Sequence, residues 1–529
     1  MRRNGILLAA MPAMVVASTL VAQVHEHAAI REKLGTVHFA TSCRPAVAPE
    51  FDRAVALLHS FEFRTAIRSF NAVLATDSSC AMAEWGVALS RWANPMTQGN
   101  RTTSQLEPGR QAALEATRRG ANTTVRERGY IAAVNQLYAD YEHSDQRTRV
   151  AAYERAMAEL TRDQPADTEA RIFHAIALTA SALPSDKTYA NQLKAGAILE
   201  AIWARQPNHP GLAHYIIHTY DIPPLAGRAV AAAKRYADIA PSAAHALHMP
   251  SHTFTRMGLW QESVNTNLRS IEVAQNESAL AEALHASDYA VYAYLQMRRD
   301  SAVRRVLATL PALAGRFDPN AITGAAPGAA GVFALAAIPA RYALERREWA
   351  EAVALRPQVS SVPYADALTH FARALGAAHT NDAATARASL DALVAIRERL
   401  LASNEAYWAE QVAIERLGAL AWLDLAEGRS DTALMHMNEA ATREDATEKG
   451  AITPGPLAPA RELLGDMLMQ IGRPSDALTQ YRLTLAKEPN RYRTLYGAMR
   501  AAAASGDKRA ERDYAAQLSK VTGSTAFRD

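Results

Sequence analysis

The chain has 529 residues and a formal net charge of +3, which gives no electrostatic reason to expect a nucleic acid or an acidic membrane surface as partner. Its length leaves room for several domains or for one extended array. Hydrophobic residues make up 49% of the chain and aromatic residues only 7%, and together with recurrent alanine runs this favours closely packed helices over sheets.

Residues 1–24 have the three parts of a secretory signal peptide. Arg2 and Arg3 precede an apolar run that begins at Ile6, and small residues such as Ala22 lie at its end. The run is short for a stable membrane span, and no later segment has a comparable run without charge. We therefore expect an exported protein, periplasmic or secreted, with no membrane span in the mature chain.

A polar segment, residues 25–49, follows the leader and contains Cys43. The second cysteine of the chain is Cys80. In an oxidising compartment two such cysteines can pair, and the loop that they would close predicts roughly 3–4 kcal/mol of stabilisation. We predict this disulfide; the alternative is two buried thiols that never meet.

From residue 50 onward, apolar and small residues recur at helical spacing. The most regular copy has Leu464 and Gly465 on one helix and Ala477, Tyr481 and Pro489 on and after the next. Other copies include Trp85-Gly86, Met257-Gly258 and the set Ala229, Ala233, Tyr236 and Pro241. This pattern resembles the tetratricopeptide repeat (TPR) family, in which Leu-Gly and an aromatic residue mark the first helix and Ala, Phe and Pro mark the second.

The resemblance, together with the leader, points to an exported bacterial-type TPR protein. It implies an all-α fold, a right-handed α-solenoid of stacked helix pairs that forms a superhelix with a concave groove. A stretch rich in Pro, Gly and Ala, residues 318–332, is expected to divide an N-terminal subarray, residues 50–317, from a C-terminal subarray, residues 333–524. The groove is expected to bind a protein, a peptide or a small-molecule ligand.

A 44-residue stretch that ends at His252 holds six of the chain's 16 histidines. His214 and His218 are four residues apart, and so are His248 and His252, which places each pair on one helical face. In the TPR family, the second, fifth and ninth residues of the first helix line the groove. The resemblance therefore implies that both pairs face the groove, with His245 beside them.

Two interpretations of this cluster remain open. Imidazole suits zinc, copper, iron or nickel, so His214, His218, His248 and His252 could complete the coordination shell of a transition-metal ion. Asp221, three residues after His218, could serve as an oxygen ligand of that ion or orient an imidazole. Alternatively, a polar groove binds a peptide or a small ligand, and its candidate residues are His174, Asp221, His245 and Arg256. Further along, His285, Asp288 and Tyr289 share one helical face; they extend the groove or merely decorate the surface.

A metal site would not by itself identify an enzyme. The HExxH pattern is absent, because Tyr-Ile-Ile separates His214 from His218 and supplies no glutamate as a base. The sequence also has no nucleophile elbow, phosphate loop, dinucleotide fingerprint or paired CxxC. Three classes of function therefore stay open: a binding scaffold, a metal-binding protein, and a metal-dependent enzyme with an open coordination position.

Overall fold

A computed structural model describes residues 32–97, 101–321 and 324–527 of the chain. The predicted leader lies outside the described residues, as does the start of the polar segment that follows it. Every regular element within the described ranges is a helix, which confirms the predicted all-α class. Among these helices, none combines the length and the apolar character that crossing a membrane would require.

The helices of the first half are α1 (Ala48–His59), α2 (Phe63–Thr76), α3 (Ala81–Trp92), α4 (Thr103–Arg119), α5 (Val125–Gln136), α6 (Gln146–Asp163), α7 (Thr168–Ser181), α8 (Ala190–Trp203), α9 (Pro210–Thr219), α10 (Val230–Ile239), α11 (Ala244–His248) and α12 (Pro250–Arg256). Those of the second half are α13 (Trp260–Asn276), α14 (Leu280–Gln296), α15 (Asp300–Ala314), α16 (Gly328–Glu345), α17 (Trp349–Ala354), α18 (Pro363–His379), α19 (Ala383–Ala402), α20 (Ala406–Ala426), α21 (Ser430–Ala446), α22 (Ala460–Gln470), α23 (Pro474–Lys487), α24 (Tyr492–Ser505) and α25 (Lys508–Thr522). Three short 3₁₀ turns, η1 (Pro45–Val47), η2 (Gly120–Asn122) and η3 (Ala226–Ala229), precede or follow helices.

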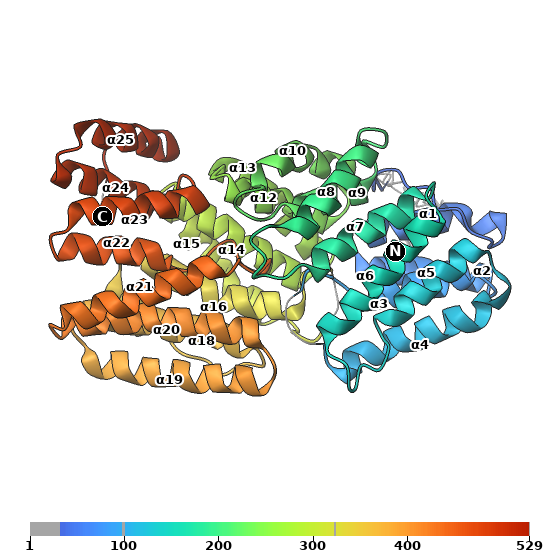
Figure 1. The fold of residues 1–529 in the computed structure, drawn as a ribbon, viewed down its shortest axis with the longest axis horizontal. Coiled ribbons are helices and arrows are strands. Elements are labelled where there is room, and N and C mark those ends of the chain that lie inside the picture. Colours follow the sequence, from blue (N-terminus) through green and yellow to red (C-terminus); the bar gives the residue numbers. More distant parts are fainter. Residues whose placement is uncertain (1–31, 98–100, 322–323, 528–529) are drawn as a thin grey trace, which may run out of the picture. The chain divides into compact units, whose positions relative to one another are not determined.

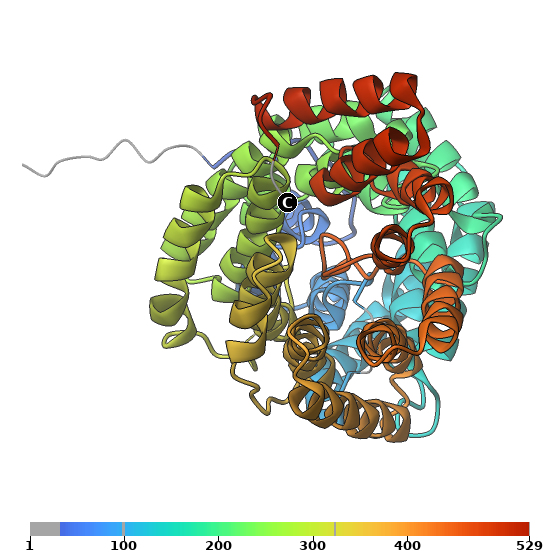
Figure 2. The ribbon, with the colours of Figure 1, turned by 90° about the vertical axis from the view of Figure 1, so that its left-hand side faces the viewer.

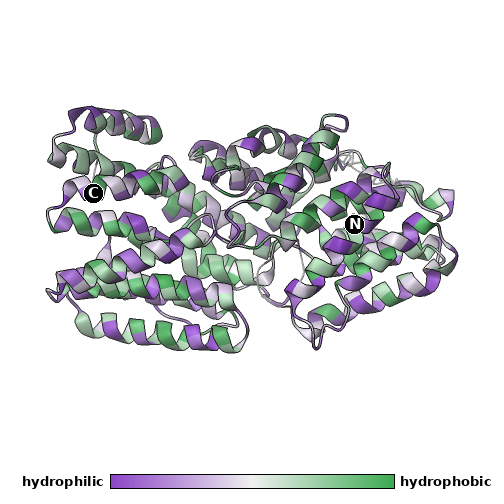
Figure 3. Cartoon of the chain, viewed as in Figure 1, coloured by the Kyte–Doolittle hydropathy of each residue, from purple (hydrophilic) through white to green (hydrophobic). Residues whose placement is uncertain are grey.

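Most helices pack mainly against the helices next to them in sequence, as α18 to α22 show in Figure 1, whereas α16 packs mainly on α14 and α18. The hydropathy colouring shows both green apolar and purple polar positions on the helices (Figure 3), as expected of helices with one buried face. A single helix pair cannot bury such a face alone, so it packs on its neighbours. The fold is a TPR-like α-solenoid of stacked helix pairs, as the repeat pattern predicted.

Two glycines of the repeat pattern lie where a side chain would not fit. A Cβ atom on Gly86 of α3 would lie 2.3 Å from the ring of Phe70 on α2. A Cβ atom on Gly465 of α22 would lie 2.7 Å from the ring of Tyr481 on α23. Both glycines therefore let a large aromatic residue of the paired helix approach the backbone, which is the packing that the repeat pattern predicts.

The predicted disulfide is confirmed, because Cys43 is bonded to Cys80 with 4.9 Å between the Cα atoms. Cys80 is the residue that precedes α3. Nearby, the backbone N–H of Arg44 donates to the Asp77 carboxylate over 2.8 Å. The disulfide and this hydrogen bond fasten the segment before α1 to the connection between α2 and α3.

The hydrophobic core follows the order of the chain. One cluster of buried residues runs from Leu34 to Phe254, with Ala325 in addition, and another runs from Phe333 to Ala502. A smaller cluster, centred on α13, α14 and α15, lies between them in sequence. The boundaries of the two predicted subarrays stay a prediction.

The connection between α21 and α22, residues 447–459, is a long loop that turns inward between helices (orange-red in Figure 2). Lys449 Nζ lies 3.2 Å from a carboxylate oxygen of Asp221, which follows α9. The hydroxyl of Tyr407 donates to the carbonyl of Glu448, and Lys187 pairs with the carboxylate of the same glutamate. The loop thereby connects helices that are more than 200 residues apart in sequence.

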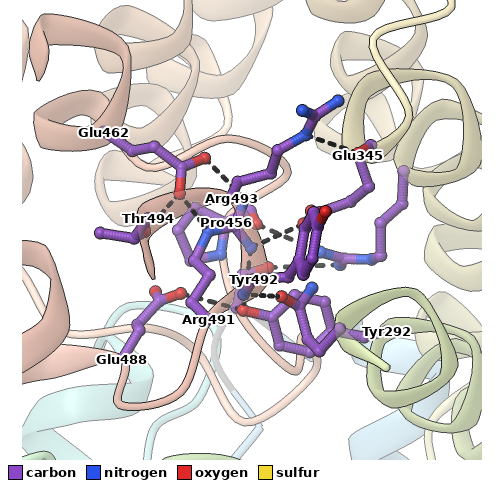
Figure 4. Close-up of polar contacts among 12 residues, drawn as sticks. Tyr292, Glu345, Pro456, Glu462, Glu488, Arg491, Tyr492, Arg493 and Thr494 are labelled. Atoms are coloured by element: carbon purple, nitrogen blue, oxygen red, sulfur yellow. Dashed lines mark hydrogen bonds and ion pairs between the residues drawn. The ribbon is translucent and has the colours of Figure 1, made fainter. Parts of the chain in front are cut away.

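A buried polar network secures the far end of this loop (Figure 4). The Arg491 guanidinium donates to Glu345 over 2.6 Å and to both carboxylate oxygens of Glu462 over 2.8 and 2.9 Å. Arg341 binds Asp288 and also donates to the carbonyls of Gly455 and Pro456 in the loop. These contacts join α14, α16, α22 and α24 around the loop, so its position is set by buried charges rather than by its own sequence.

Candidate metal centre

Six buried histidines from four short stretches of helix form one cluster. Each of them is at most 7% exposed. They are His214 and His218 on α9, His245 and His248 on α11, His252 on α12, and His285 on α14. The predicted helix through His245, His248 and His252 is divided in two, because Pro250 has no N–H to continue the ladder and starts α12.

The first trio consists of His214, His218 and His245, whose nearest ring nitrogens all lie within 4.8 Å of one another. His214 Nδ1 donates to the backbone carbonyl of His59 over 2.6 Å. His245 Nδ1 donates to the Glu282 carboxylate over 3.0 Å. In both rings the proton is thus held on Nδ1, which leaves Nε2 with its lone pair.

The Nε2 atoms of all three rings of this trio are buried and have no hydrogen-bond partner among the described residues. Buried polar atoms are almost always paired, so three unpaired atoms side by side require an explanation. The ring of Phe61 covers one side of the trio, with centroids 4.4 Å from His214 and 5.7 Å from His245. This is the donor arrangement that a transition-metal ion uses, with one coordination position left over.

The second trio consists of His248, His252 and His285, whose ring nitrogens also lie within 4.8 Å of one another. His248 Nε2 and His252 Nε2 face each other over 3.1 Å. On the other edges of these rings, His248 Nδ1 contacts Asn267 Oδ1 over 2.7 Å and His252 Nδ1 contacts Asp221 Oδ2 over 2.8 Å. The four histidines predicted to bind metal therefore converge, but they are divided between two trios that His245 and His285 complete.

Burial keeps the imidazoles of His214, His218, His248, His252 and His285 neutral by lowering their pKa values. It lowers the pKa of His285 to about 3, with the neighbouring histidines adding to the effect against the opposing charge of Glu282. The pKa values of His214, His218 and His248 also lie well below the usual value, again because of burial first and neighbouring histidines second. Neutral imidazole is the form that binds metal ions.

The Asp221 carboxylate lies at the outer edge of the His252 ring and has three side-chain partners. It accepts from His252, from Arg256 Nε over 2.9 Å, and from Lys449. Burial alone would raise the pKa of Asp221, but Lys449 and Arg256 hold it well below its usual range. Burial lowers the pKa of Lys449 to about 8. Asp221 and Arg256, predicted as groove residues, pair with each other, so neither guanidinium nor carboxylate is presented alone to a ligand.

Tyr289 of α14 closes the second trio from the side of the loop. Its ring centroid lies 4.9 Å from those of His248 and His252, and its hydroxyl lies 3.2 and 3.1 Å from the carbonyls of Ala451 and Thr453. The long loop thus covers histidines that the resemblance placed on the concave groove.

His209, the first histidine of the 44-residue stretch, belongs to a different group. The carboxylate of Glu169 accepts from His59 Nε2 over 2.9 Å and from His209 Nε2 over 2.8 Å, and His59 Nδ1 lies 3.0 Å from the hydroxyl of Tyr215. Burial would raise the pKa of Glu169, but the two imidazoles hold it well below its usual range. We call this group the closed triad, because its carboxylate accepts from both imidazoles; His209 Nδ1 is buried without a hydrogen-bond partner among the described residues.

His174 on α7, another predicted groove residue, is not brought to the cluster. Its Nε2 lies 3.0 Å from a carboxylate oxygen of Glu154 on α6. The sequence pattern did not indicate Glu169, Glu282 or Asn267, the residues that orient the imidazoles. It indicated His285 only as a possible extension of the groove, because His285 lies on another helix 33 residues beyond His252.

A cavity of about 570 Å³ opens beside the cluster. Four of the six imidazoles line it, two from each trio: His218, His245, His252 and His285. The lining of the cavity also includes Trp92 of α3, Tyr364 of α18 and Trp408 of α20. Both trios therefore border the same space.

No known family and no curated protein matches the sequence. Among solved structures, the human IFIT1 dimer with m7Gppp-AAAA is similar with a TM-score of 0.36 at 11% identity, covering 88% of this chain and 95% of that chain. The human IFIT1 dimer with PPP-AAAA has a TM-score of 0.38 at 11% identity and the same coverage. Similarity this low assigns no ligand to this chain.

These neighbours nevertheless correct one expectation. The exclusion of nucleic acid as a partner, drawn from the small net charge, is withdrawn: the similar helical structures were solved with m7Gppp-AAAA or PPP-AAAA, and a small net charge does not exclude such a ligand. A near-neutral total charge says nothing of local patches on a long array. What the chain shares with these structures is a helical, TPR-like fold.

Proposed function

We propose that the protein binds a transition-metal ion through His214, His218 and His245. The single observation that carries this proposal is the set of three buried Nε2 atoms without hydrogen-bond partners among the described residues, on three rings that each bring a ring nitrogen within 4.8 Å of the other two. An all-imidazole site suits zinc, copper, iron or nickel. The carbonyl of His59 and the carboxylate of Glu282 would act as the outer partners that fix the ring orientations.

The test compares metal content and stability in two matched variants. Protein without an affinity tag would be prepared metal-free, loaded with zinc, copper, nickel or iron, and analysed by elemental analysis and thermal unfolding. His218→Gln should lower the metal content by one ion per chain. His174→Gln, which removes a buried histidine paired with Glu154, should leave it unchanged. A wild-type chain that binds none of these metals, or equal losses in both variants, would contradict the proposal.

A second candidate function is a scaffold for a small-molecule ligand. The observation in its favour is the cavity of about 570 Å³, a volume within the roughly 300–1,000 Å³ range of small-molecule sites. We propose a small molecule rather than a peptide as its occupant, since the long loop covers the cluster. Native mass spectrometry of protein from its own host should show a mass above that of the chain and its metal; a mass without such an excess would contradict this.

We also propose that the protein acts outside the cytosol, in a periplasm or after secretion. The leader pattern supports this, and so does the disulfide between Cys43 and Cys80, because disulfides persist in oxidising compartments. N-terminal sequencing of the native protein should find a mature chain that begins near residue 25. Recovery of the full chain, with Arg2 and Arg3, from the cytosol would contradict it.

A further inference from the structure

We propose that the protein holds a second transition-metal ion in the trio His248, His252 and His285, next to the first, so that the two form a dinuclear centre open to one cavity. The inference rests on the proposed function, because it takes the first trio to be a metal site. It goes beyond the proposed function by adding a second metal ion and by opening both ions to one cavity.

His248 Nε2 and His252 Nε2 lie 3.1 Å apart. The side-chain nitrogen of Asn267 donates to the carbonyl of Ser263 over 2.7 Å, so its oxygen faces His248 Nδ1 and accepts the proton there. The Asp221 carboxylate, which only accepts, takes the proton of His252 Nδ1. Both Nε2 atoms therefore present lone pairs to each other, which is repulsive unless a cation lies between them.

The distance between these two nitrogens suits a metal ion. Zinc binds imidazole nitrogen at about 2.0–2.1 Å, so two nitrogens on a tetrahedral ion are separated by about 3.3 Å. The observed 3.1 Å is close to that value. His285 supplies the third nitrogen within 4.8 Å, and its ring centroid lies 4.5 Å from that of His248. The three rings thus form a site with the same donor set as the first trio.

A carboxylate holds the outer edge of the His252 ring. A metal-binding histidine commonly donates its other N–H to a carboxylate, which fixes the ring and strengthens the ligand. Asp221 has that position, and Arg256 and Lys449 hold its carboxylate in place. A carboxylate held by three partners behind an imidazole edge is a built site rather than a chance contact.

The two trios are neighbours. The ring centroids of His218 and His252 are 6.0 Å apart, and so are those of His245 and His248. Two rings of each trio line the cavity of about 570 Å³. Each ion would have three protein ligands, so its remaining coordination position would face this shared space. A small anion with oxygen or nitrogen donors could then bind to both ions at once.

The first experiment counts ions per chain with His245→Gln, His285→Gln and the double variant, using His174→Gln as control. We expect two zinc or copper ions in the wild type and control, one in each single variant and none in the double variant. No ion in the wild type would overturn the proposed function and this inference together. One ion in the wild type that persists in His285→Gln would overturn this inference alone.

A second experiment needs no variant. In the copper(II)-loaded wild type, electron paramagnetic resonance should detect fewer spins than copper ions, because neighbouring copper(II) ions couple. Adding azide, a small anion that bridges copper ions, should change the visible absorption at about one azide per two coppers. A spin count equal to a copper content of two per chain, or azide binding separately to each ion, would overturn the dinuclear assignment.

Discussion

The closed triad and the two histidine trios contain the same side chain at the same burial, and they differ in one partner. In the closed triad, the Glu169 carboxylate lies between His59 and His209 and accepts from both. In the trios, the outer edges of four rings reach acceptors: His214, His245, His248 and His252. The Nε2 atoms of the first trio have no partner among the described residues, and those of His248 and His252 face each other. Under the proposed function, a buried imidazole is structural or metal-binding according to where the nearest carboxylate lies, inside the group or behind it.

The comparison also shows how little the sequence position decides. His209 and His214 are five residues apart at the start of α9. The first is paired with Glu169, and the second donates its Nδ1 proton to the carbonyl of His59 and leaves Nε2 unpaired. His209 is the N-cap of α9 and has an extended backbone, whereas His214 lies within the helix, so the two rings meet different neighbours.

The largest expected effect comes from breaking the closed triad with Glu169→Gln. A glutamine offers one acceptor oxygen where two imidazoles donate, so one N–H is left buried and unpaired. We expect the free energy of unfolding to fall by about 3 kcal/mol, typical of breaking a buried pair. Urea denaturation of the metal-free protein measures this. The metal content should not change; loss of metal would show that the triad and the trios are not independent.

The same variant tests the sign of the pH dependence. Since the pKa of Glu169 lies well below its usual range, its contribution is present above the unfolded pKa of a glutamate, about 4.3, and is lost as the pH falls below it. The difference in unfolding free energy between wild type and Glu169→Gln should therefore shrink from pH 5 to pH 3. A constant difference over that range would contradict the depressed pKa.

The next largest effect is expected on metal binding at the second trio. Asp221→Asn removes the carboxylate behind His252 and should weaken metal binding at the second trio about 10–100-fold, with the first trio unaffected. Competition with a chromophoric chelator measures both affinities. Because the variant leaves Arg256 and Lys449 without their counter-charge, the double variant Asp221→Asn/Lys449→Met serves as control. Equal weakening of both trios would argue against a separate second site.

A smaller effect is expected from Asn267→Ala. His248 Nδ1 would lose the acceptor that keeps its proton there, so Nε2 would carry the proton in part of the molecules. We expect about tenfold weaker binding at the second trio, because the ligand atom must first be deprotonated. Nuclear magnetic resonance of labelled histidine would report the change of tautomer. Unchanged tautomer and affinity would show that Asn267 has no role in the site.

The smallest effect concerns Lys449. Its charge lies next to Asp221 and repels a cation in the second trio, so Lys449→Met should bind metal about threefold more tightly there. Burial lowers the pKa of Lys449 to about 8, so the wild-type affinity should approach that of the variant as the pH rises from 7 to 9. Isothermal titration at these pH values checks it; a variant with weaker binding would contradict it.

Part of the candidate site follows from local spacing. Residues four apart on a helix share a face whatever the helix packs on, so the pairs His214–His218 and His248–His252 could be recognised from their spacing alone. The periodic small residues predicted the helices and their stacking, and the isolated cysteine pair predicted the disulfide. These are properties of short segments or of composition.

The partners of the histidines could not be predicted in this way. Glu169 is 110 residues from His59, Glu282 is 37 residues from His245, and Lys449 is 228 residues from Asp221. Nothing in the local pattern distinguishes these charged residues from the many that face water. The contacts that place the loop over the cluster are also distant in sequence, because Arg341 donates both to Asp288 and to the carbonyl of Gly455 in the loop.

The sequence by itself determined the helices, their repeat and the faces that carry histidine, because helical periodicity is a local property of the chain. Only the tertiary structure decided which imidazoles pair with a carboxylate, which leave Nε2 atoms unpaired, and how six rings divide into two trios beside one cavity. The physical reason is that hydrogen bonding and burial in this site depend on contacts between α1, α9, α11, α12 and α14, and those contacts arise only when the helices stack.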